Sequence, residues 1–351
     1  MKRFNKIMLF SVAFLAMAAT GCGNSNGGEN SQNSSASASS QPQPEPAGPS
    51  VFILTGQSNM EGKSRVDESA LRTFCTDNGF DCVEDILSTG EGLPEVRTSF
   101  YGCGYGEIYK GENNIHASYD GDGLKINGKF LNTKVGMGDG NSTIGPELGA
   151  ALAIRDEVDS DKPVYFIKCG ISGSGFDQGD SQGSKCDWNV EKEESLYSNI
   201  LKPYTTNCLN LIEEEAGMKP VIKGFLWNQG ESDAYDGKIE LYNDRFDTLF
   251  NKFKEDFKEY APEEEGDNIA LIDALIFEGT EGQRNYKPVE INDEKLKNIA
   301  RHDNYYYVDA TQREGGLALS MGNDNLHYNF PSMLKLGMAY GQAILENNLL
   351  D

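Results

Sequence analysis

The chain has 351 residues, enough for one large α/β domain or for two domains of ordinary size. It carries 31 Lys and Arg residues against 55 Asp and Glu residues, which gives a formal net charge of −24. Because affinity for nucleic acid depends on cationic side chains that neutralise phosphates, this charge argues against a nucleic-acid partner and against a basic membrane-surface protein. A hydrophobic fraction of 38% excludes a disordered chain.

The first 22 residues have the organisation of a bacterial export signal. Met1–Lys6 is positively charged, and Ile7–Ala19 is an apolar stretch too short to span a bilayer. The small residues before Cys22 resemble the lipobox of bacterial lipoproteins, in which the cysteine becomes the lipidated N-terminus. An ordinary signal peptide is the alternative. We predict an exported bacterial lipoprotein at the cell envelope, in the periplasm or at the cell surface, whose only membrane contact is the lipid anchor on Cys22.

Apart from Glu29 and Glu45, residues 23–49 consist of Gly, Asn, Ser, Gln, Ala and Pro, with almost no apolar side chains. Such a segment cannot bury enough surface to fold, so we predict a disordered tether over 23–49 and one folded domain over 50–351.

Six cysteines remain if Cys22 is lipidated: Cys75, Cys82, Cys103, Cys169, Cys186 and Cys208. An exported location permits up to three disulfides among them, and the sequence leaves their pairing open. Because no CxxC pair occurs and the cysteines are not interleaved with histidines, we predict no structural zinc site.

The folded domain alternates short apolar runs with amphipathic segments. The runs typical of buried strands are 51–54, 164–167, 222–227, 269–276 and 305–308. The segments with helical spacing are 146–155, 196–215, 241–257, 293–300 and 331–348. Strands that alternate with helices predict an α/β fold with a mostly parallel sheet covered on both faces. In such sheets, functional sites gather at the carboxyl ends of the strands.

Residues 63–143 interrupt this alternation and are rich in glycine. Leu124–Phe130 contains an Asn-Gly pair that is typical of a tight hairpin. We expect a loop insertion that forms one wall of a cleft and contains His116. Asp120 and Asp122 lie in a Gly-rich loop, but EF-hand spacing is absent, so we expect no calcium site.

The segment Gly56–Gly62, GQSNMEG, directly follows the first predicted strand. A serine on a sharp strand-to-helix turn has an exposed hydroxyl with a backbone N–H beside it, which suits a nucleophile and half of an oxyanion hole. The pattern is Gly-x-Ser-x-Met and not the Gly-x-Ser-x-Gly of α/β-hydrolases. Ser58 could equally cap a helix.

The segment Asp324–Tyr328, DNLHY, precedes the last predicted helix. An Asp three residues before a His can fold back so that its carboxylate meets one ring nitrogen, which leaves the other nitrogen free to act as a base. His327 is one of three histidines in the chain. The alternative is a surface histidine beside a turn aspartate.

Two further clusters follow predicted strands. In Trp227–Asp233, WNQGESD, an amide could point an N–H at a developing oxyanion, or the segment could be a polar turn with a helix cap at Ser232. The backbone amides of Gly170–Gly175, GISGSG, could supply another donor. A phosphate loop is the alternative, but a P-loop Lys is absent.

Taken together and in this order, GQSNM, WNQGESD and DNLH resemble the sialic-acid-specific acetylesterase group. That group includes carbohydrate esterase family 6 and belongs to the SGNH-hydrolase superfamily. The resemblance covers about residues 51–340 and is specific at the motifs. It implies a three-layer α/β/α sandwich with a mostly parallel, flavodoxin-like sheet. It also implies a serine esterase that removes O-acetyl groups from carbohydrates without a metal or an organic cofactor.

The resemblance also implies roles for individual residues. Ser58 would be the nucleophile, His327 the general base and Asp324 the acid that orients it. Gly173 and Gln229 would complete the oxyanion hole with the Ser58 amide, although this chain has Ser172–Gly175, SGSG, where the family usually has Gly-Gly-Ser/Thr-Ser.

Three further residues are expected to support this site, and they are Gln57, Asn59 and Glu231. Glu231 is also the second candidate for the acid partner of His327.

Two classes of function remain open. The leading prediction is an exported esterase acting on acetylated plant polysaccharide such as acetylated xylan, with a sialate O-acetylesterase as the variant. The other class is a non-catalytic surface glycan-binding lipoprotein, against which the intact Ser58, Asp324 and His327 argue. Among the aromatic residues, Trp188 could line the cleft, whereas Tyr305–Tyr307 is expected to be core or strand.

Overall fold

The computed structural model describes residues 48–350 except 105–106, 109–117, 121–122, 126–129, 141, 177–186, 193, 237–238, 263–267 and 280–285. These residues belong to one structural unit, Pro46–Asp351. The predicted anchor at Cys22, most of the tether and His116 lie outside the described residues. Among the residues that are described, no helix is long and apolar enough to cross a bilayer.

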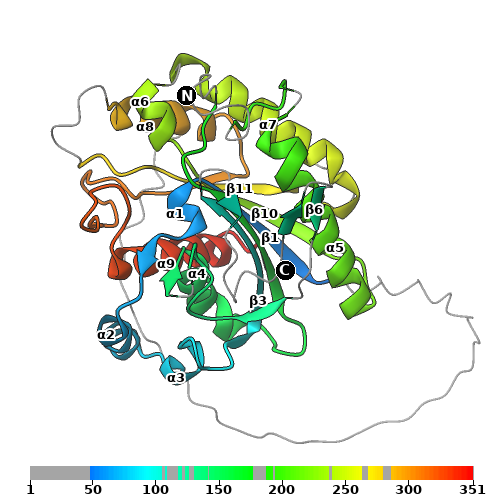
Figure 1. Cartoon of the computed structure of the whole chain (residues 1–351), viewed down its shortest axis with the longest axis vertical. Coiled ribbons are helices and arrows are strands. Elements are labelled where there is room, and N and C mark those ends of the chain that lie inside the picture. Colours follow the sequence, from blue (N-terminus) through cyan, green and yellow to red (C-terminus); the bar gives the residue numbers. More distant parts are fainter. Residues whose placement is uncertain are drawn as a thin grey trace, which may run out of the picture. The chain divides into compact units, whose positions relative to one another are not determined.

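The centre of the fold is a mostly parallel sheet (Figure 1). Its strands are β1 (Ser50–Gly56), β3 (Leu93–Gly104), β4 (Glu107–Ile108), β7 (Leu131–Thr133), β9 (Val164–Ile171), β10 (Val221–Asn228), β11 (Ala270–Ala274) and β12 (Tyr305–Val308). The strand order is β12-β11-β10-β1-β9-β3-β4, and β7 pairs with β3. The pairs formed by β4 and β7 with β3 are antiparallel, and the other pairs are parallel.

Helices cover both faces of this sheet. They are α2 (Glu68–Asn78), α3 (Val83–Ile86), α4 (Glu147–Ile154), α5 (Lys202–Ala216), α7 (Tyr242–Asp256), α8 (Pro288–Ile299) and α9 (Phe330–Glu346), with two short helices, α1 (Ser58–Glu61) and α6 (Glu231–Asp236), at strand ends. In Figure 1, α4 and α9 lie on one side of the sheet, and α5 and α7 lie on the other.

Alternation along β1 explains these layers. Val51 and Ile53 belong to the apolar core shared with α5 and α7, whereas Phe52 and Leu54 belong to the core shared with α4 and α9. Because successive side chains of a strand point to opposite faces, an unbroken apolar run can serve two helical layers at once. The predicted three-layer α/β/α sandwich is confirmed.

Strand β1 lies where the direction of sheet growth reverses. The chain adds β3 and β9 on one side of β1 and then β10, β11 and β12 on the other. The carboxyl ends of β9, β1 and β10 therefore lie side by side, and such a switch point is where open α/β sheets bind ligands.

The largest error of the sequence-based prediction lies within residues 63–143, which were expected to be a loop insertion. They contain β3, a strand of 12 residues that pairs in parallel with β9 inside the main sheet. This strand was missed because its polar residues break the apolar pattern expected of a buried strand. Thr98 and Ser99 are nevertheless buried, because Thr98 is hydrogen-bonded to Thr133 and Ser99 to Tyr204.

The turn of the hairpin expected over Leu124–Phe130 lies outside the described residues; before it β6 (Gly123–Lys125) pairs with β5 (Ser118–Asp120), and after it β7 pairs with β3. One smaller expectation is also corrected. The helix predicted over 293–300 starts earlier in the structure, since α8 begins at Pro288. The four cysteines whose side chains are described are buried and not joined in disulfides: Cys75, Cys82, Cys169 and Cys208.

Candidate active site

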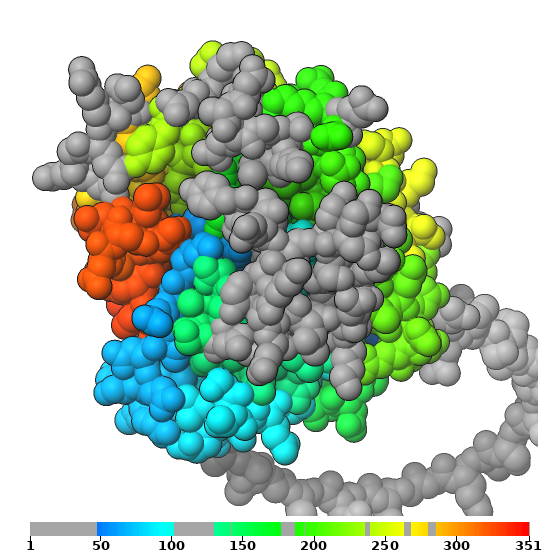
Figure 2. Space-filling model, viewed as in Figure 1, coloured from blue at the N-terminus to red at the C-terminus, as the bar shows by residue number. Residues whose placement is uncertain are grey.

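The three clusters that follow strands, together with the segment before α9, meet at the carboxyl edge of the sheet. Residues 171–175 follow β9, residues 57–62 follow β1, and residues 229–233 follow β10. The Tyr328 N–H donates to Asn59 Oδ1 at 3.3 Å, and Ser64 Oγ donates to the Tyr328 carbonyl at 2.6 Å. In Figure 2 the orange-red segment before α9 accordingly lies beside the blue segment after β1.

Ser58 is the first residue of α1 and is separated from the end of β1 by a single residue, Gln57. The helix cap is Gln57, whose side chain makes no capping hydrogen bond, so Ser58 is not a capping residue. The turn depends on Gly56, which has φ 140° and at which a Cβ would lie 2.1 Å from the Asn228 carbonyl oxygen. The first amides of a helix lack intrahelical partners, which leaves the Ser58 N–H available as a donor.

Asp324 and His327 form a local pair. Asp324 Oδ2 lies 2.6 Å from His327 Nδ1, and Asp324 Oδ1 accepts the backbone N–H groups of Leu326 and His327 at 3.0 Å each. Burial would raise the pKa of Asp324, but these hydrogen bonds outweigh burial and hold the pKa below its usual range. Asn325, with φ 54°, makes the tight turn between the two residues.

Glu231, the second candidate partner of His327, makes a different contact. Its Oε1 accepts Asn59 Nδ2 at 2.8 Å, and its Oε2 is buried with no hydrogen-bond partner among the described residues. Asn59 is therefore held between Glu231 and the backbone of Tyr328. Asp324 is the carboxylate that meets the His327 ring, and Glu231 supports the turn that carries Ser58.

The imidazole of His327 and the hydroxyl of Ser58 are not hydrogen-bonded to each other in this structure. Hydrogen bonds of this kind are often long in unliganded enzymes and tighten only in the complex with substrate.

Gln229, predicted from the sequence as an oxyanion donor, is fully buried. Its Nε2 donates to Asp233 Oδ2 at 2.6 Å and lies within 3.3 Å of two further acceptors, Gln57 Oε1 and the Ser174 carbonyl. Tyr242 in turn donates to Gln229 Oε1 at 3.0 Å. Because protein acceptors surround this amide, Gln229 is part of the support beneath the site.

Gln57 and Asp233 complete that support. Gln57 Oε1 lies 3.4 Å from the Gly230 N–H and 3.3 Å from the Ser232 N–H, so it joins the turns after β1 and β10. Burial raises the pKa of Asp233 to about 7, although hydrogen bonds from Gln229 and from the Phe176 backbone oppose this shift.

The loop after β9 presents Gly173. This glycine has φ 69° and is partly exposed, whereas Ser172 and Ser174 on either side are buried. Ser174 Oγ accepts Trp188 Nε1 at 2.7 Å. Trp188 is fully buried against Trp227, with ring centroids 5.5 Å apart, so the expectation that it lines a cleft is wrong.

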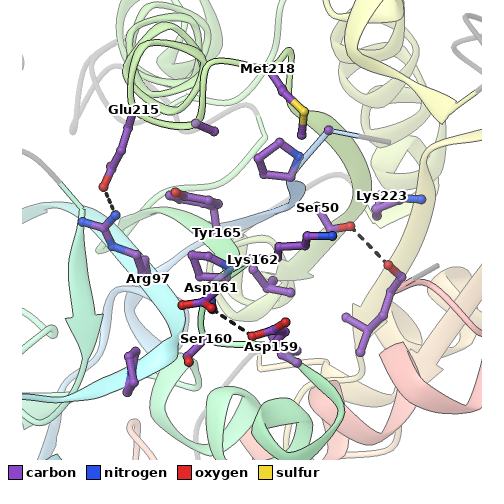
Figure 3. Close-up of a pocket in the computed structure, with 18 of the residues that line it drawn as sticks. Ser50, Arg97, Asp159, Ser160, Asp161, Lys162, Tyr165, Glu215, Met218 and Lys223 are labelled. Carbon is purple, nitrogen blue, oxygen red and sulfur yellow. Dashed lines mark hydrogen bonds and ion pairs between the residues drawn. The ribbon is translucent and has the colours of Figure 1, made fainter. Parts of the chain in front are cut away.

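A surface pocket of about 930 Å³ lies elsewhere, at the amino ends of the strands (Figure 3). It is lined by Ser50 at the start of β1, Val164 at the start of β9, and the charged residues Arg97, Lys162 and Glu215. None of the predicted catalytic residues lines it. Within the described part of the chain, no group of three or more His, Cys, Asp or Glu side chains is arranged to hold a metal ion.

Comparisons with known proteins bear on the family and on the fold. A family model described as "Carbohydrate esterase, sialic acid-specific acetylesterase" matches residues 126–346, a range that contains Gly173, Gln229, Asp324 and His327 but not Ser58. A relative from Arabidopsis thaliana named as a probable carbohydrate esterase is 25% identical over 206 residues, 58% of this chain. The match spans 64% of that relative, less than two thirds of its length.

Solved structures share the fold. The X-ray structure of the same Arabidopsis thaliana protein superposes with a TM-score of 0.52 at 20% identity, covering 86% of this chain and 99% of the other. The crystal structure of NanS gives a TM-score of 0.51 at 14% identity, covering 86% and 98% of the two chains.

Proposed function

The chain belongs to the sialic acid-specific acetylesterase family of carbohydrate esterases, and from this premise we propose that it hydrolyses O-acetyl esters of carbohydrates with Ser58 as the nucleophile. The observation that carries the proposal is the pairing of Asp324 with His327 on a segment that is hydrogen-bonded to Asn59, the neighbour of Ser58.

In the proposed acylation step, His327 Nε2 accepts the Ser58 proton as the hydroxyl oxygen attacks the acetyl carbonyl carbon. The Asp324 carboxylate holds the proton on Nδ1, so that Nε2 is the basic nitrogen, and it stabilises the imidazolium that forms. His327 then protonates the sugar oxygen as the C–O bond breaks. Water repeats the sequence on the acetyl-enzyme and releases acetate.

The oxyanion of each tetrahedral intermediate needs preorganised donors. We assign the Ser58 N–H, at the start of α1, and the Gly173 N–H, in the partly exposed turn after β9. Gln229 supports these donors through Gln57 and Ser174 and does not touch the oxyanion. Loss of one oxyanion donor typically lowers kcat by roughly 10²–10³-fold.

For the substrate, we propose acetylated plant polysaccharide such as acetylated xylan, with O-acetylated sialic acid as the second candidate because the family description names it. The predicted export signal and the predicted lipobox at Cys22 would keep the enzyme at the cell envelope, where such glycans are met.

The proposal is tested by measuring acetate release from p-nitrophenyl acetate by the folded domain, residues 50–351. The variants Ser58→Ala and His327→Ala are measured in the same assay. We expect turnover by the wild type and background rates for both variants. Acetylated xylan and O-acetyl sialic acid are then compared at equal enzyme concentration. A folded wild type no faster than either variant would overturn the esterase assignment and favour a glycan-binding protein.

A further inference from the structure

The turn that carries Ser58 ends in a buried carboxylate to which the mechanism assigns no role. Glu61 is the last residue of α1, and its side chain is fully buried. Its Oε2 accepts a hydrogen bond from the Ser172 hydroxyl and lies 3.4 Å from Lys63 Nζ, while its Oε1 has no partner among the described residues. A buried, half-partnered carboxylate costs stability that an apolar side chain would not cost, so its contacts need an explanation.

Ser172 is the residue before Gly173, so Glu61 joins the nucleophile turn to the turn that holds the proposed second oxyanion donor. The two segments are also in backbone contact, because a Cβ on Gly170 would lie 2.2 Å from the Glu61 nitrogen. Within the turn after β9, the Ser174 N–H donates a hydrogen bond to the Ile171 carbonyl oxygen at 3.3 Å. The Ser172–Glu61 bond therefore joins the residue before Gly173 to α1, whereas Ser174, on the other side of Gly173, bonds Trp188 and lies 3.5 Å from the Gly56 carbonyl oxygen.

One cationic group, Lys63, partly offsets the effect of burial on the Glu61 carboxyl group. Burial raises the pKa of Glu61, and Lys63, followed by the Ser172 hydrogen bond, opposes the shift. Lys63 is shared with Asp139, whose Oδ2 lies 2.6 Å from Nζ. The buried Lys168, paired with Glu147 at 2.6 Å, lies near the same carboxylate.

Resting on the proposed esterase function, we infer that Glu61 is a positioning residue that holds Ser172, and through it the Gly173 N–H, at the place where the oxyanion develops. Glu61 touches no reacting atom. Since the oxyanion exists only during the reaction, loss of this contact removes stabilisation of the transition state and leaves binding of the substrate almost unchanged.

Four variants test this inference: Ser172→Ala, Glu61→Gln, Glu61→Leu and the double variant Glu61→Leu/Ser172→Ala. We expect Ser172→Ala and Glu61→Leu to lower kcat about 10–100-fold with KM within about 2-fold of wild type. Glu61→Gln retains an oxygen that accepts from Ser172, so it should keep most of kcat. The double variant should be no slower than Glu61→Leu alone, because both changes break one contact.

The matched control is Ser99→Ala. Ser99 is also buried and bonds a side chain, the Tyr204 hydroxyl at 2.7 Å, but it lies within β3 and away from the turn. The Ser99→Ala variant should be less stable than the wild type but should have the wild-type kcat. Wild-type kcat for Ser172→Ala would overturn the inference, and so would losses that add in the double variant. If Glu61→Leu does not fold, Ser172→Ala and Glu61→Gln still decide the question.

Failure of the proposed function would look different, because the wild type would then hydrolyse no ester. In that case crystal structures of wild type and Ser172→Ala decide the positioning role. A displaced Gly173 turn in the variant supports it, and an unchanged distance between Gly173 N and Ser58 Oγ overturns it.

Discussion

Asp324 contacts His327 twice, through the ring and through the backbone. Oδ2 lies 2.6 Å from the ring Nδ1, and Oδ1 accepts the backbone N–H at 3.0 Å. Because both contacts join residues only three positions apart, one turn of four residues, Asp324–His327, holds the pair. The same segment is joined to the Ser58 turn by the hydrogen bond from the Tyr328 N–H to Asn59, and to the residues just after that turn by the hydrogen bond from Ser64 to the Tyr328 carbonyl.

Asp324→Asn should lower kcat by about 10²–10³-fold. The amide introduced at position 324 either donates to Nδ1 or leaves the Nδ1 proton without an acceptor, and both arrangements favour the ring tautomer in which Nε2 carries the proton. In a buried triad, this change lowers kcat about 10⁴-fold. The Asp324 side chain is 54% exposed, so water replaces part of its effect and the loss is smaller. Steady-state kinetics on p-nitrophenyl acetate measure it. Glu231→Gln is the comparison, and a larger loss there would make Glu231 the acid partner.

Asn59→Ala should lower both activity and stability. It leaves the Glu231 carboxylate and the Tyr328 N–H unpaired, at about 2–3 kcal/mol in the free energy of unfolding. It also frees the His327 segment from the Ser58 turn, so kcat should fall about 10–100-fold. The control is Asn243→Ala, which removes a similar bond from an asparagine to Glu294 Oε2, 3.1 Å long, between α7 and α8. Urea unfolding should show comparable losses, and kcat should fall only in Asn59→Ala.

Gly56→Ala should lower the free energy of unfolding by more than about 3 kcal/mol. Gly56 has φ 140°, which residues other than glycine rarely adopt, and a Cβ at this position would lie 2.1 Å from the Asn228 carbonyl oxygen. Gly79→Ala is the matched control. Gly79 also has positive φ, 75°, but nothing lies within 4 Å of its Cβ position, so about 1 kcal/mol is expected from backbone strain alone. Thermal unfolding measures both variants, and equal losses would show that strain and not the contact with β10 governs Gly56.

Asp233 should make stability fall as pH rises. Its pKa is raised from 3.8 to about 7, mainly by burial, so the folded state holds a proton that the unfolded state releases. The contribution of the protonated group is complete below about pH 4 and is lost as pH rises toward 7, at about 1.4 kcal/mol for each pKa unit. The free energy of unfolding of wild type minus that of Asp233→Asn should therefore decrease over this range. Taking the difference cancels other groups, including Asp273, whose pKa is also raised. Parallel curves for the two proteins would contradict the shift.

Features that depend on local spacing along the chain could be predicted from the sequence. Apolar runs alternating with helical patterns predicted the parallel sheet, because each run supplies side chains to both faces, as Phe52 and Ile53 do. The spacing of Asp324 and His327 predicted their contact, because three residues are enough for the chain to fold back and bring the carboxylate to the ring.

Which polar groups face the site, and which lie beneath it, depends on how distant segments pack together. Gln229 and Trp188 follow strand ends as a donor and a cleft wall would, but neighbouring elements bury both of them. Strand β3 escaped prediction because Thr98 and Ser99 are satisfied by Thr133 and Tyr204, which are distant in sequence. Burial and hydrogen-bond partners depend on what packs against a residue, and that information belongs to the fold as a whole and not to any segment of the chain.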